Sequence, residues 1–459
     1  MLSPAQLDSL KALVPPDSLS AGESARGLHS RDQSSHEAHL PDVVIWPETT
    51  EQVSRILACA DRERIAVTGW GAGSSLEGNS IPLRGGIVLD FGRMNRILTV
   101  YASDFQVTVQ PGIFYKDMNK SLAPHGLFFA PDPGANASIG GMIANNAAGT
   151  RTPKYGATRD NVLALEVVLA NGDVIRTGSR SVKQSAGYDL THLFVGSEGT
   201  LGIITEATLR LAPLPEHFSA VVASFATTTD AANAVFGVMG AGLNPAALEL
   251  LDAPCMAAIN RSHEFDWQVA PTLFLEFHGA SAASLEVELE VVKEICEQMG
   301  SQSFTAGLGR EARDRLWRAR HGLFESLVRV YPRQAYLITD VSVPISQYPP
   351  LVAEAADVLD KMPDVNAFIF GHAGDGNMHS VIFFDNRPAE YERVQTGFND
   401  RVVEKAIALG GTSTGEHGVG IGKQKYMVRE HGEIAMDLMR RLKEFFDPHV
   451  ILNPGKVVG

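Results

Sequence analysis

Cysteine is scarce in this sequence: Cys59, Cys255 and Cys296 are the only three in 459 residues. They lie far apart and form no Cys-x-x-Cys pair, so neither a disulfide framework nor a thiolate metal site is indicated. The sequence also lacks the basic and apolar stretches of a secretory signal, and no run of about 18 apolar residues predicts a transmembrane helix. We therefore expect a cytoplasmic protein, and peripheral contact with the inner face of a membrane stays open.

Basic residues are also fewer than acidic residues. The chain has 39 Lys and Arg against 53 Asp and Glu, which gives a formal net charge of −14. Because no basic run is present to engage phosphates, we expect no nucleic-acid partner. The length predicts two or three domains with ample core, and the sequence makes no prediction of the oligomeric state.

The composition and the predicted secondary structure of the chain change near Phe218. Before it, from residue 42 to about 213, glycine is dense and short strands dominate; after it, strands alternate with helices. The second pattern favours an α+β domain whose helices cover one face of a sheet. Among the predicted helices, one spans Thr49–Asp61 with Thr50 as its cap, and another spans Glu311–Val330.

The segment Gly371–His379, Gly-His-Ala-Gly-Asp-Gly-Asn-Met-His, carries the strongest chemical signal. It lies between two apolar runs, Asn366–Phe370 and Met378–Phe384, which predict a β-hairpin around a Gly/Asp/Asn turn. His372 and His379 stand on either side of that turn, so we expect them to face each other across the two strands.

A later glycine-rich loop, Gly415–Gly420, carries Glu416 and His417. Two imidazoles and a carboxylate, from His372, His379 and Glu416, form a ligand set that suits Zn²⁺, Mn²⁺ or Fe²⁺ with open coordination positions. His417 is then available as a general base. A lone histidine beside an apolar strand is usually a core residue, but two of them with a glycine-framed Glu-His pair favour a metal site.

Four glycine-rich loops precede these motifs. The first, Gly69–Ser80, has no lysine and does not match G-x-G-x-x-G, so a Walker A site is excluded, and a tight turn would explain it equally well. The others are Pro131–Gly141 with Asn145–Gly149 after it, Lys154–Asn161 and Gly196–Gly202. Together they favour a long, thin ligand held by backbone, such as a dinucleotide.

The order of these motifs resembles the flavoproteins of the vanillyl-alcohol oxidase type. Within that group, the chain is similar to the branch of D-lactate dehydrogenases (cytochrome), glycolate oxidase flavin subunits and D-2-hydroxyglutarate dehydrogenases. The resemblance runs from about residue 30 to 457. The segments that carry it are Pro131–Gly134, Gly196–Thr205, His372–His379, Gly415–Gly418 and Asn453–Lys456.

This resemblance implies an α+β fold: a vanillyl-alcohol-oxidase-type FAD-binding domain with an α+β, ferredoxin-like cap domain. The implied domains are residues 1–215 for the N-terminal part of the FAD-binding domain, 216–420 for the substrate or cap domain with the metal site, and 421–459 for a segment that returns to the FAD-binding domain.

The resemblance also implies FAD. Some relatives attach FAD through a histidine in the first glycine loop, and Gly71–Ser75 has none, so we expect non-covalent FAD. The implied cofactor-binding residues are Gly71, Ala72, Gly73, Ser74, Ser75, Gly78, Asn79, Pro131, Asp132, Gly134, Ala135, Ser138, Gly140, Gly141, Asn145, Gly149, Thr150, Gly156, Glu198, Gly202, Ile204 and Asn453.

By the same resemblance, the substrate is a small 2-hydroxy acid. Arg320 matches the arginine that binds the substrate carboxylate, and we expect His417 to contact the substrate as well. Asn377 would either contact and orient the substrate or orient a ligand histidine. The 2-hydroxyglutarate enzymes place a lysine where this chain has Ile338 and a threonine where it has Phe324. These departures favour a monocarboxylate, with D-lactate first.

The expected mechanism follows from these roles. A divalent metal on His372, His379 and Glu416 would chelate the substrate and acidify its hydroxyl. His417 would take the hydroxyl proton, Arg320 would fix the carboxylate, and a hydride would pass to flavin N5. The electrons would go on to a cytochrome, a quinone or an electron-transfer flavoprotein.

Other interpretations stay open at this stage. The chain could be the flavin subunit of a glycolate-oxidase-like complex, a D-2-hydroxyglutarate dehydrogenase, an alkylglycerone-phosphate-synthase-like transferase, or a metal hydrolase without flavin. Single residues also have plainer roles: Arg320 in a surface salt bridge, Glu198 closing a turn, Asp375 shaping the hairpin, and Trp70 and Trp317 in packing.

Overall fold

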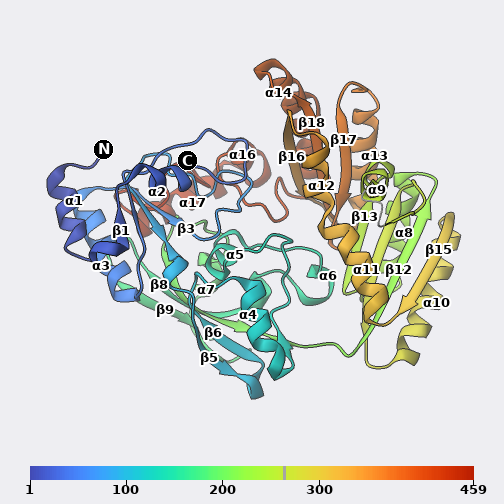
Figure 1. The fold of residues 1–459 in the computed structure, drawn as a ribbon, viewed down its shortest axis with the longest axis horizontal. Coiled ribbons are helices and arrows are strands. Elements are labelled where there is room, and N and C mark those ends of the chain that lie inside the picture. The colour runs from blue at the N-terminus through green and yellow to red at the C-terminus, as the bar shows by residue number, and fades with distance from the viewer. Residues whose placement is uncertain (262–264) are drawn as a thin grey trace. The chain divides into compact units, whose positions relative to one another are not determined.

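The computed structural model of this chain describes residues 1–261 and 265–459 (Figure 1). The chain forms two compact units. The first consists of residues 1–148, 156–214 and 416–459, and the second of residues 149–155 and 215–415. The second unit ends at Gly415 rather than at the predicted residue 420, so Glu416 and His417 belong to the first unit.

The first unit contains a four-stranded sheet in the order β1-β2-β4-β3, in which β4 is parallel to both β2 and β3. A five-stranded antiparallel sheet follows in the order β5-β6-β10-β8-β9, and β11 pairs with β7. The strands are β1 Leu19–Ser20, β2 Val43–Ile45, β3 Val67–Trp70, β4 Ile87–Asp90, β5 Ile97–Tyr101, β6 Gln106–Val109, β7 Leu127–Phe128, β8 Val162–Val168, β9 Val174–Gly178, β10 Ile203–Arg210 and β11 Ala212–Pro213.

Helices of the first unit cover these sheets. They are α1 Pro4–Lys11, α2 Glu23–Leu28, α3 Thr50–Glu63, α4 Tyr115–Leu122, α5 Ile139–Asn145, α7 Thr191–Phe194, α16 Gln424–His431 and α17 Glu433–Phe446. The C-terminal segment returns to the first sheet, because Leu452 forms a parallel bridge with Val67 of β3. One core cluster joins α1 and α3 to the first sheet and contains Leu452, so the last residues of the chain complete this core.

Helix α3 shows how local sequence builds this unit. Its apolar face, with Val53, Ile56 and Leu57, is fully buried as the periodicity predicts. The cap is Thr49 rather than the predicted Thr50, since the Thr49 side chain accepts a hydrogen bond from the Gln52 N–H. Thr50 instead donates its hydroxyl to the carboxylate of Glu166 on β8, at 2.6 Å.

The second unit is built on a seven-stranded antiparallel sheet in the order β15-β12-β14-β13-β17-β18-β16. Its strands are β12 His217–Phe225, β13 Ala247–Leu251, β14 Thr272–Gly279, β15 Ser301–Leu308, β16 Gln334–Ser342, β17 Asn366–Gly371 and β18 Asn377–Asp385. Its helices are α6 Thr152–Tyr155, α8 Thr228–Gly240, α9 Ala253–Asn260, α10 Ala282–Gln298, α11 Arg310–His321, α12 Leu323–Val330, α13 Tyr348–Leu359, α14 Pro388–Val394 and α15 Asp400–Ala408.

Helices cover both faces of this sheet, so the expectation of a single covered face is wrong. Helices α9, α11 and α12 pack on the face that carries Phe274, Phe370 and Phe383. Helices α8 and α10 contact β12 and β14 from outside that cluster (Figure 1). The physical reason lies in the strands: every residue of β13, including those facing away from the cluster, is buried and needs a packing partner.

The predicted hairpin is confirmed. Strands β17 and β18 pair antiparallel with Phe370 opposite His379, and a short 3₁₀ turn over Ala373–Asp375 joins them. The predicted helix over Glu311–Val330 is interrupted: α11 ends at His321 and α12 begins at Leu323, with Gly322 between them. Glycine disfavours the interior of a helix because its backbone loses more conformational freedom there than that of other residues.

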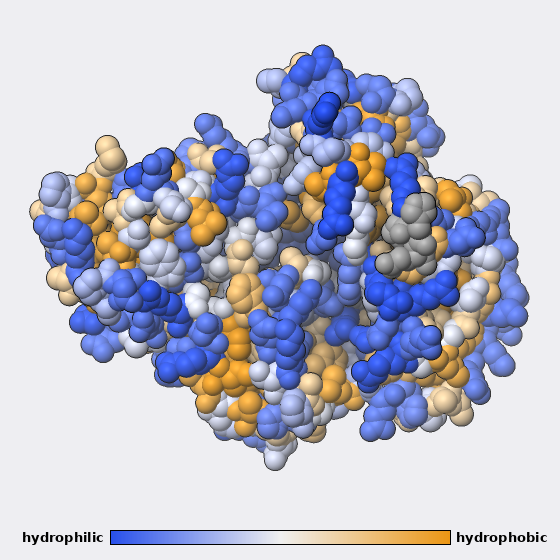
Figure 2. Space-filling model, viewed as in Figure 1, coloured by the Kyte–Doolittle hydropathy of each residue, from blue (hydrophilic) through white to orange (hydrophobic). Residues whose placement is uncertain are grey.

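Among the described residues, no helix combines the length and the apolar character needed to cross a bilayer. On the face of the molecule drawn in Figure 2, hydrophilic side chains predominate and hydrophobic ones form small groups between them.

Candidate active site

A cleft in the first unit gathers the glycine-rich loops. It contains about 1260 Å³ of empty space, its open mouth included. Many of the predicted cofactor residues line it: Gly71, Ala72, Gly73, Ser74, Ser75, Asn79, Ala135, Ser138, Gly140, Gly141, Asn145, Glu198, Gly202, Ile204 and Asn453. Glu416 and His417, predicted as metal ligand and base, line the same cleft.

The walls of this cleft fit a long ligand held by backbone. A Cβ atom on Gly71 would stand 2.1 Å from the Ser138 hydroxyl oxygen, and one on Gly140 would stand 2.6 Å from the Pro111 Cβ. Only glycine therefore lets these segments approach each other and present their amides to the cleft. Together with the serine hydroxyls, this lining suits the pyrophosphate of a dinucleotide such as FAD.

The remaining predicted cofactor residues, all of them in the described part of the chain, lie outside the lining of this cleft. They are Gly78, Pro131, Asp132, Gly134, Gly149, Thr150 and Gly156. Asp132 accepts a hydrogen bond from the Tyr115 hydroxyl at 2.7 Å, so it fastens the loop Pro131–Gly141 rather than lining the cleft. Gly149 and Thr150 belong to the second unit, and Gly78 packs against Ile421 instead.

Sequence reasoning missed other lining residues. Several are neighbours in the same loops, but Phe91 and Pro111 come from segments without a glycine-rich pattern, so only the fold identifies them. Trp70 also lines the cleft, although it is 92% buried and packs edge-on against His29 at 4.9 Å, as expected of a packing residue.

Glu198 fastens the Glu-His loop to the first unit. Its buried carboxylate accepts hydrogen bonds from the N–H groups of Val419 at 2.6 Å and Gly420 at 2.9 Å. Burial raises the pKa of Glu198, against the opposing effect of these donors. Glu198 therefore does more than close a turn, because it binds a segment that is more than 200 residues away in the chain.

The backbone of His417 is held from the other side. The side-chain amides of Asn145 and Asn79 lie 3.3 and 3.5 Å from its carbonyl oxygen and donate to it. Gly418, with φ of +83°, lies so close to Asn79 and Glu198 that a Cβ atom would stand 2.7 Å from the Asn79 nitrogen. The glycines of this loop thus allow His417 to be fixed at the cleft.

In the second unit, the hairpin brings the two predicted metal-ligand histidines together. The ring centroids of His372 and His379 lie 5.2 Å apart, with the ring planes nearly perpendicular. Nδ1 of His372 lies 2.6 Å from one oxygen of Glu249, and the other oxygen of Glu249 lies 2.7 Å from Nε of Arg320. Arg320 is therefore in a buried ion pair, rather than in the surface salt bridge of the plainer interpretation.

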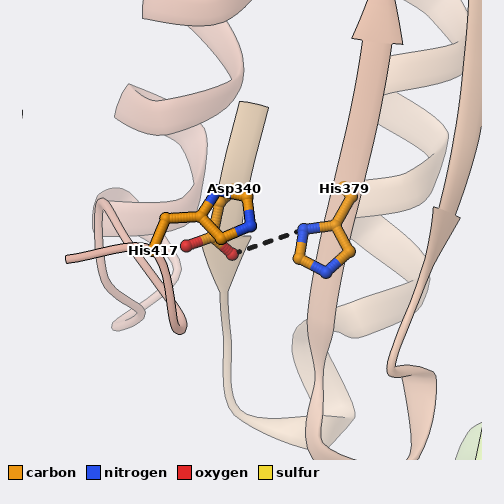
Figure 3. Close-up of side chains that lie close together, drawn as sticks. All are labelled: Asp340, His379 and His417. Atoms are coloured by element: carbon orange, nitrogen blue, oxygen red, sulfur yellow. Dashed lines mark ion pairs between the residues drawn. The ribbon is translucent and has the colours of Figure 1, made fainter. Parts of the chain in front are cut away.

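Asp340 supports the second histidine. Figure 3 shows its carboxylate, on β16, in an ion pair with Nδ1 of His379 on β18, at 3.5 Å. Asp340 also accepts hydrogen bonds from the Asn377 amide at 2.7 Å and from the Thr414 hydroxyl and Gly415 N–H, both at 2.8 Å. It thereby orders the residues that directly precede Glu416 in the chain.

Burial alone would raise the pKa of Glu249, but its contacts with His372 and Arg320 outweigh burial and hold that pKa below its usual value. Neither Glu249 nor the partner role of Asp340 was predicted from the sequence. A signal existed for Glu249, which is the single acid in the apolar strand Ala247–Leu251, and an acid there needs a buried partner.

Comparison with known proteins identifies the family. Residues 41–178 match the family "FAD binding domain", and residues 214–457 match "FAD linked oxidases, C-terminal domain". The chain belongs to the FAD-linked oxidase family. The expectations of an FAD-dependent oxidoreductase and of the vanillyl-alcohol-oxidase-type fold are confirmed.

The similar relatives of this oxidase span nearly its whole length. The chain is 41% identical to "Probable D-lactate dehydrogenase, mitochondrial" of Danio rerio over 98% of its length and 91% of the relative. It is 39% identical to "D-lactate dehydrogenase [cytochrome], mitochondrial" of Arabidopsis thaliana, with coverage of 99% and 80%. It is also 39% identical to "Glycolate oxidase subunit GlcD" of Bacillus subtilis, with coverage of 96% and 94%.

Solved structures support the fold of this FAD-linked oxidase. p-Cresol methylhydroxylase matches with a TM-score of 0.80 at 20% identity, covering 99% of this chain and 97% of that one. Alkyldihydroxyacetonephosphate synthase matches with a TM-score of 0.77 at 20% identity, covering 100% and 86%. At this identity the likeness concerns the fold alone.

Proposed function

We propose that this FAD-linked oxidase converts a small D-2-hydroxy acid, D-lactate first, into the corresponding 2-oxo acid. Its likeness to D-lactate dehydrogenases of Danio rerio and Arabidopsis thaliana supports this substrate class. Ile338 supports a monocarboxylate, because it packs against the apolar cluster of the second unit and offers no cation for a second carboxylate.

We propose His372, His379 and Glu416 as ligands of a divalent metal, either Zn²⁺, Mn²⁺ or Fe²⁺. One observation carries this proposal: each histidine has a buried carboxylate beside its Nδ1, Glu249 in one case and Asp340 in the other. A carboxylate at Nδ1 is the usual support of a metal-binding histidine, since it orients Nε2 as the ligand and raises its basicity.

The two bound groups would supply different chemistry. The metal would act as a Lewis acid that lowers the pKa of the substrate hydroxyl, and FAD, non-covalently bound, would accept the hydride. The protein supplies the rest: Arg320 binds the carboxylate, and His417 takes the hydroxyl proton. Asn377 orients a ligand histidine through Asp340, which is the second of the two roles considered for it.

For the electron acceptor, we propose a cytochrome, supported by the likeness to the D-lactate dehydrogenase [cytochrome] of Arabidopsis thaliana. A quinone or an electron-transfer flavoprotein is the alternative acceptor. We place the enzyme in a reducing compartment such as the cytoplasm, because its three cysteines are all free thiols in the buried interior.

Glycolate is the second candidate substrate, favoured by the likeness to the Bacillus subtilis subunit. That likeness also supports a second candidate function, a flavin subunit that requires partner chains. Purified protein that reduces a dye with D-lactate or glycolate in the absence of any other chain would exclude a required partner.

The test is a flavin-bleaching experiment on the purified, FAD-loaded protein without oxygen. D- and L-lactate, glycolate and D-2-hydroxyglutarate are added with and without chelator, and the loss of yellow absorbance is followed. We expect rapid bleaching by D-lactate, none by L-lactate, and strong slowing after metal removal with recovery on adding Zn²⁺ or Mn²⁺. Bleaching by L-lactate alone would reject the stereochemistry, and full activity after metal removal would reject the metal.

A further inference from the structure

Glu249 is the acidic residue that joins two parts of the proposed site in the second unit. It lies in the middle of β13, is fully buried, and has leucines on both sides. One carboxylate oxygen contacts Nδ1 of His372 at 2.6 Å, and the other contacts Nε of Arg320 at 2.7 Å. Each oxygen therefore serves one functional side chain.

The register of the sheet explains this arrangement. Glu249 lies opposite Phe274 on β14, and Leu251, two residues further along the same face, lies opposite Phe370 on β17. Phe370 in turn pairs with His379. Because side chains two residues apart on a strand share a face, Glu249 points to the same side of the sheet as the hairpin histidines.

A buried carboxylate needs compensation, and here both compensating groups are functional. Removing one partner of a buried ion pair leaves an uncompensated charge, which is costly, so the three side chains hold one another in place. Glu249 also fixes the tautomer of His372: the proton stays on Nδ1, and Nε2 becomes the nitrogen that can bind a cation.

Glu249 also orients the side chain of Arg320. Its guanidinium lies over the ring of Phe370, with 4.9 Å between the guanidinium carbon and the ring centroid, and Glu249 engages Nε. A guanidinium is planar and rigid, so these two contacts fix the direction of its terminal nitrogens. Those nitrogens are the ones that bind a carboxylate through two parallel hydrogen bonds.

We infer that Glu249 is a positioning residue that orients the metal ligand His372 and the carboxylate-binding Arg320 together. Loss of its charge then weakens metal binding and substrate binding in one step. This inference rests on the proposed function, because it assumes the roles given there to His372 and Arg320.

The chain offers a matched control in Glu276 on β14. Glu276 is 1% exposed, lies on the same face of the same sheet, and contacts a histidine and an arginine of its own, His278 and Arg313. Glu276→Gln therefore removes the same kind of buried charge as Glu249→Gln, but away from the hairpin.

The experiment compares wild type, Glu249→Gln and Glu276→Gln as full-length, FAD-loaded proteins. Zn²⁺ affinity is measured by competition with a chromogenic chelator, and KM and kcat for D-lactate are measured separately. FAD content and Tm report folding. We expect Glu249→Gln to retain FAD, to lose Zn²⁺ affinity by about 10- to 100-fold, as for other partners of metal-binding histidines, and to raise KM by on the order of tenfold.

Wild-type Zn²⁺ affinity and KM in Glu249→Gln would overturn the inference, as would equal losses in Glu276→Gln. A wild-type protein that neither binds Zn²⁺ nor oxidises a hydroxy acid would instead reject the proposed function. If Glu249→Gln does not fold, NMR spectra of ¹⁵N-histidine-labelled wild type test the inference, because they show which ring nitrogen of His372 carries the proton. The signals of His372 are assigned by comparison with a His372→Asn variant. We expect a proton on Nδ1 of His372; a proton on Nε2 alone would overturn the inference.

Discussion

Glu198 and Val419 are joined by a hydrogen bond of 2.6 Å from the Val419 N–H to the Glu198 carboxylate, across 221 positions of sequence. A second bond, from the Gly420 N–H at 2.9 Å, strengthens the connection. The loop that carries Glu416 and His417 is therefore held at the cleft of the first unit by an acid from the loop Gly196–Gly202. The position of the proposed base, His417, therefore depends on Glu198, which lies in a different loop.

Glu198→Gln should slow substrate-dependent flavin bleaching by on the order of tenfold, because charged hydrogen bonds to two backbone donors are weakened. The measurement is stopped-flow absorbance under anaerobic conditions. Glu206→Gln on β10 removes a half-buried acid nearby in sequence and serves as the control. A Glu198→Gln protein that bleaches at the wild-type rate would show that the loop does not need this anchor.

His417→Ala should slow flavin bleaching by about 10²- to 10⁴-fold, the usual contribution of a general base. FAD content should stay at the wild-type level, since the loop is held through the backbone and the histidine contributes only part of the lining. His431→Ala, at the exposed end of α16, is the control. An unchanged rate would exclude His417 as the base, and loss of FAD would assign it a binding role instead.

Gly140→Ala should lower FAD affinity sharply. The added Cβ would stand 2.6 Å from the Pro111 Cβ and 3.1 Å from the Pro111 carbonyl oxygen, so one wall of the cleft must move. Gly27→Ala is the matched control, because nothing lies within 4 Å of its Cβ position. Fluorescence titration of the apoprotein with FAD measures the effect, and equal affinities in the two variants would contradict it.

The pair His29–Asp90 should make the stability of the first unit depend on pH. Both ring nitrogens of His29 face acceptors, Asp90 at 2.9 Å and the Ala25 carbonyl at 2.7 Å, and only the imidazolium can donate to both. Burial opposes the charge, but the hydrogen bond and charge of Asp90 outweigh it and raise the pKa of His29 above 6.5. The stabilisation is therefore complete below pH 6.5 and fades as pH rises through the higher folded-state pKa.

Thermal unfolding of wild type and His29→Gln from about pH 6 to about pH 9 checks this sign. The difference in Tm should be largest at low pH and shrink as pH rises. His125→Gln, at an exposed position in a short 3₁₀ helix, should show no such trend. A difference in Tm that grows with pH would mean that His29 is neutral in the folded protein.

Local sequence correctly predicted the elements whose structure depends on residues close together in the chain. The apolar face of α3 and the hairpin of β17 and β18 both follow from periodicity and turn residues. Local sequence did not determine the cap of α3, because both Thr49 and Thr50 can cap a helix. Thr49 is the cap, and the Thr50 hydroxyl binds Glu166 of strand β8 instead.

For the candidate site, sequence predicted which residue types meet in each motif but not which partners hold them. The hairpin placed His372 and His379 together, because a turn and a register define that distance. Nothing near Glu249 in the sequence indicates that it lies between His372 and Arg320, more than 70 residues away in either case.

The sequence of this oxidase therefore determined its motifs, its local elements and, through their order, its family. The tertiary structure alone decided that Glu249, Asp340 and Glu198 support the site, and that both faces of the large sheet are covered. The physical reason is that turns and periodicity act over a few residues, whereas a buried charge selects its partner through packing of segments that are distant in the chain.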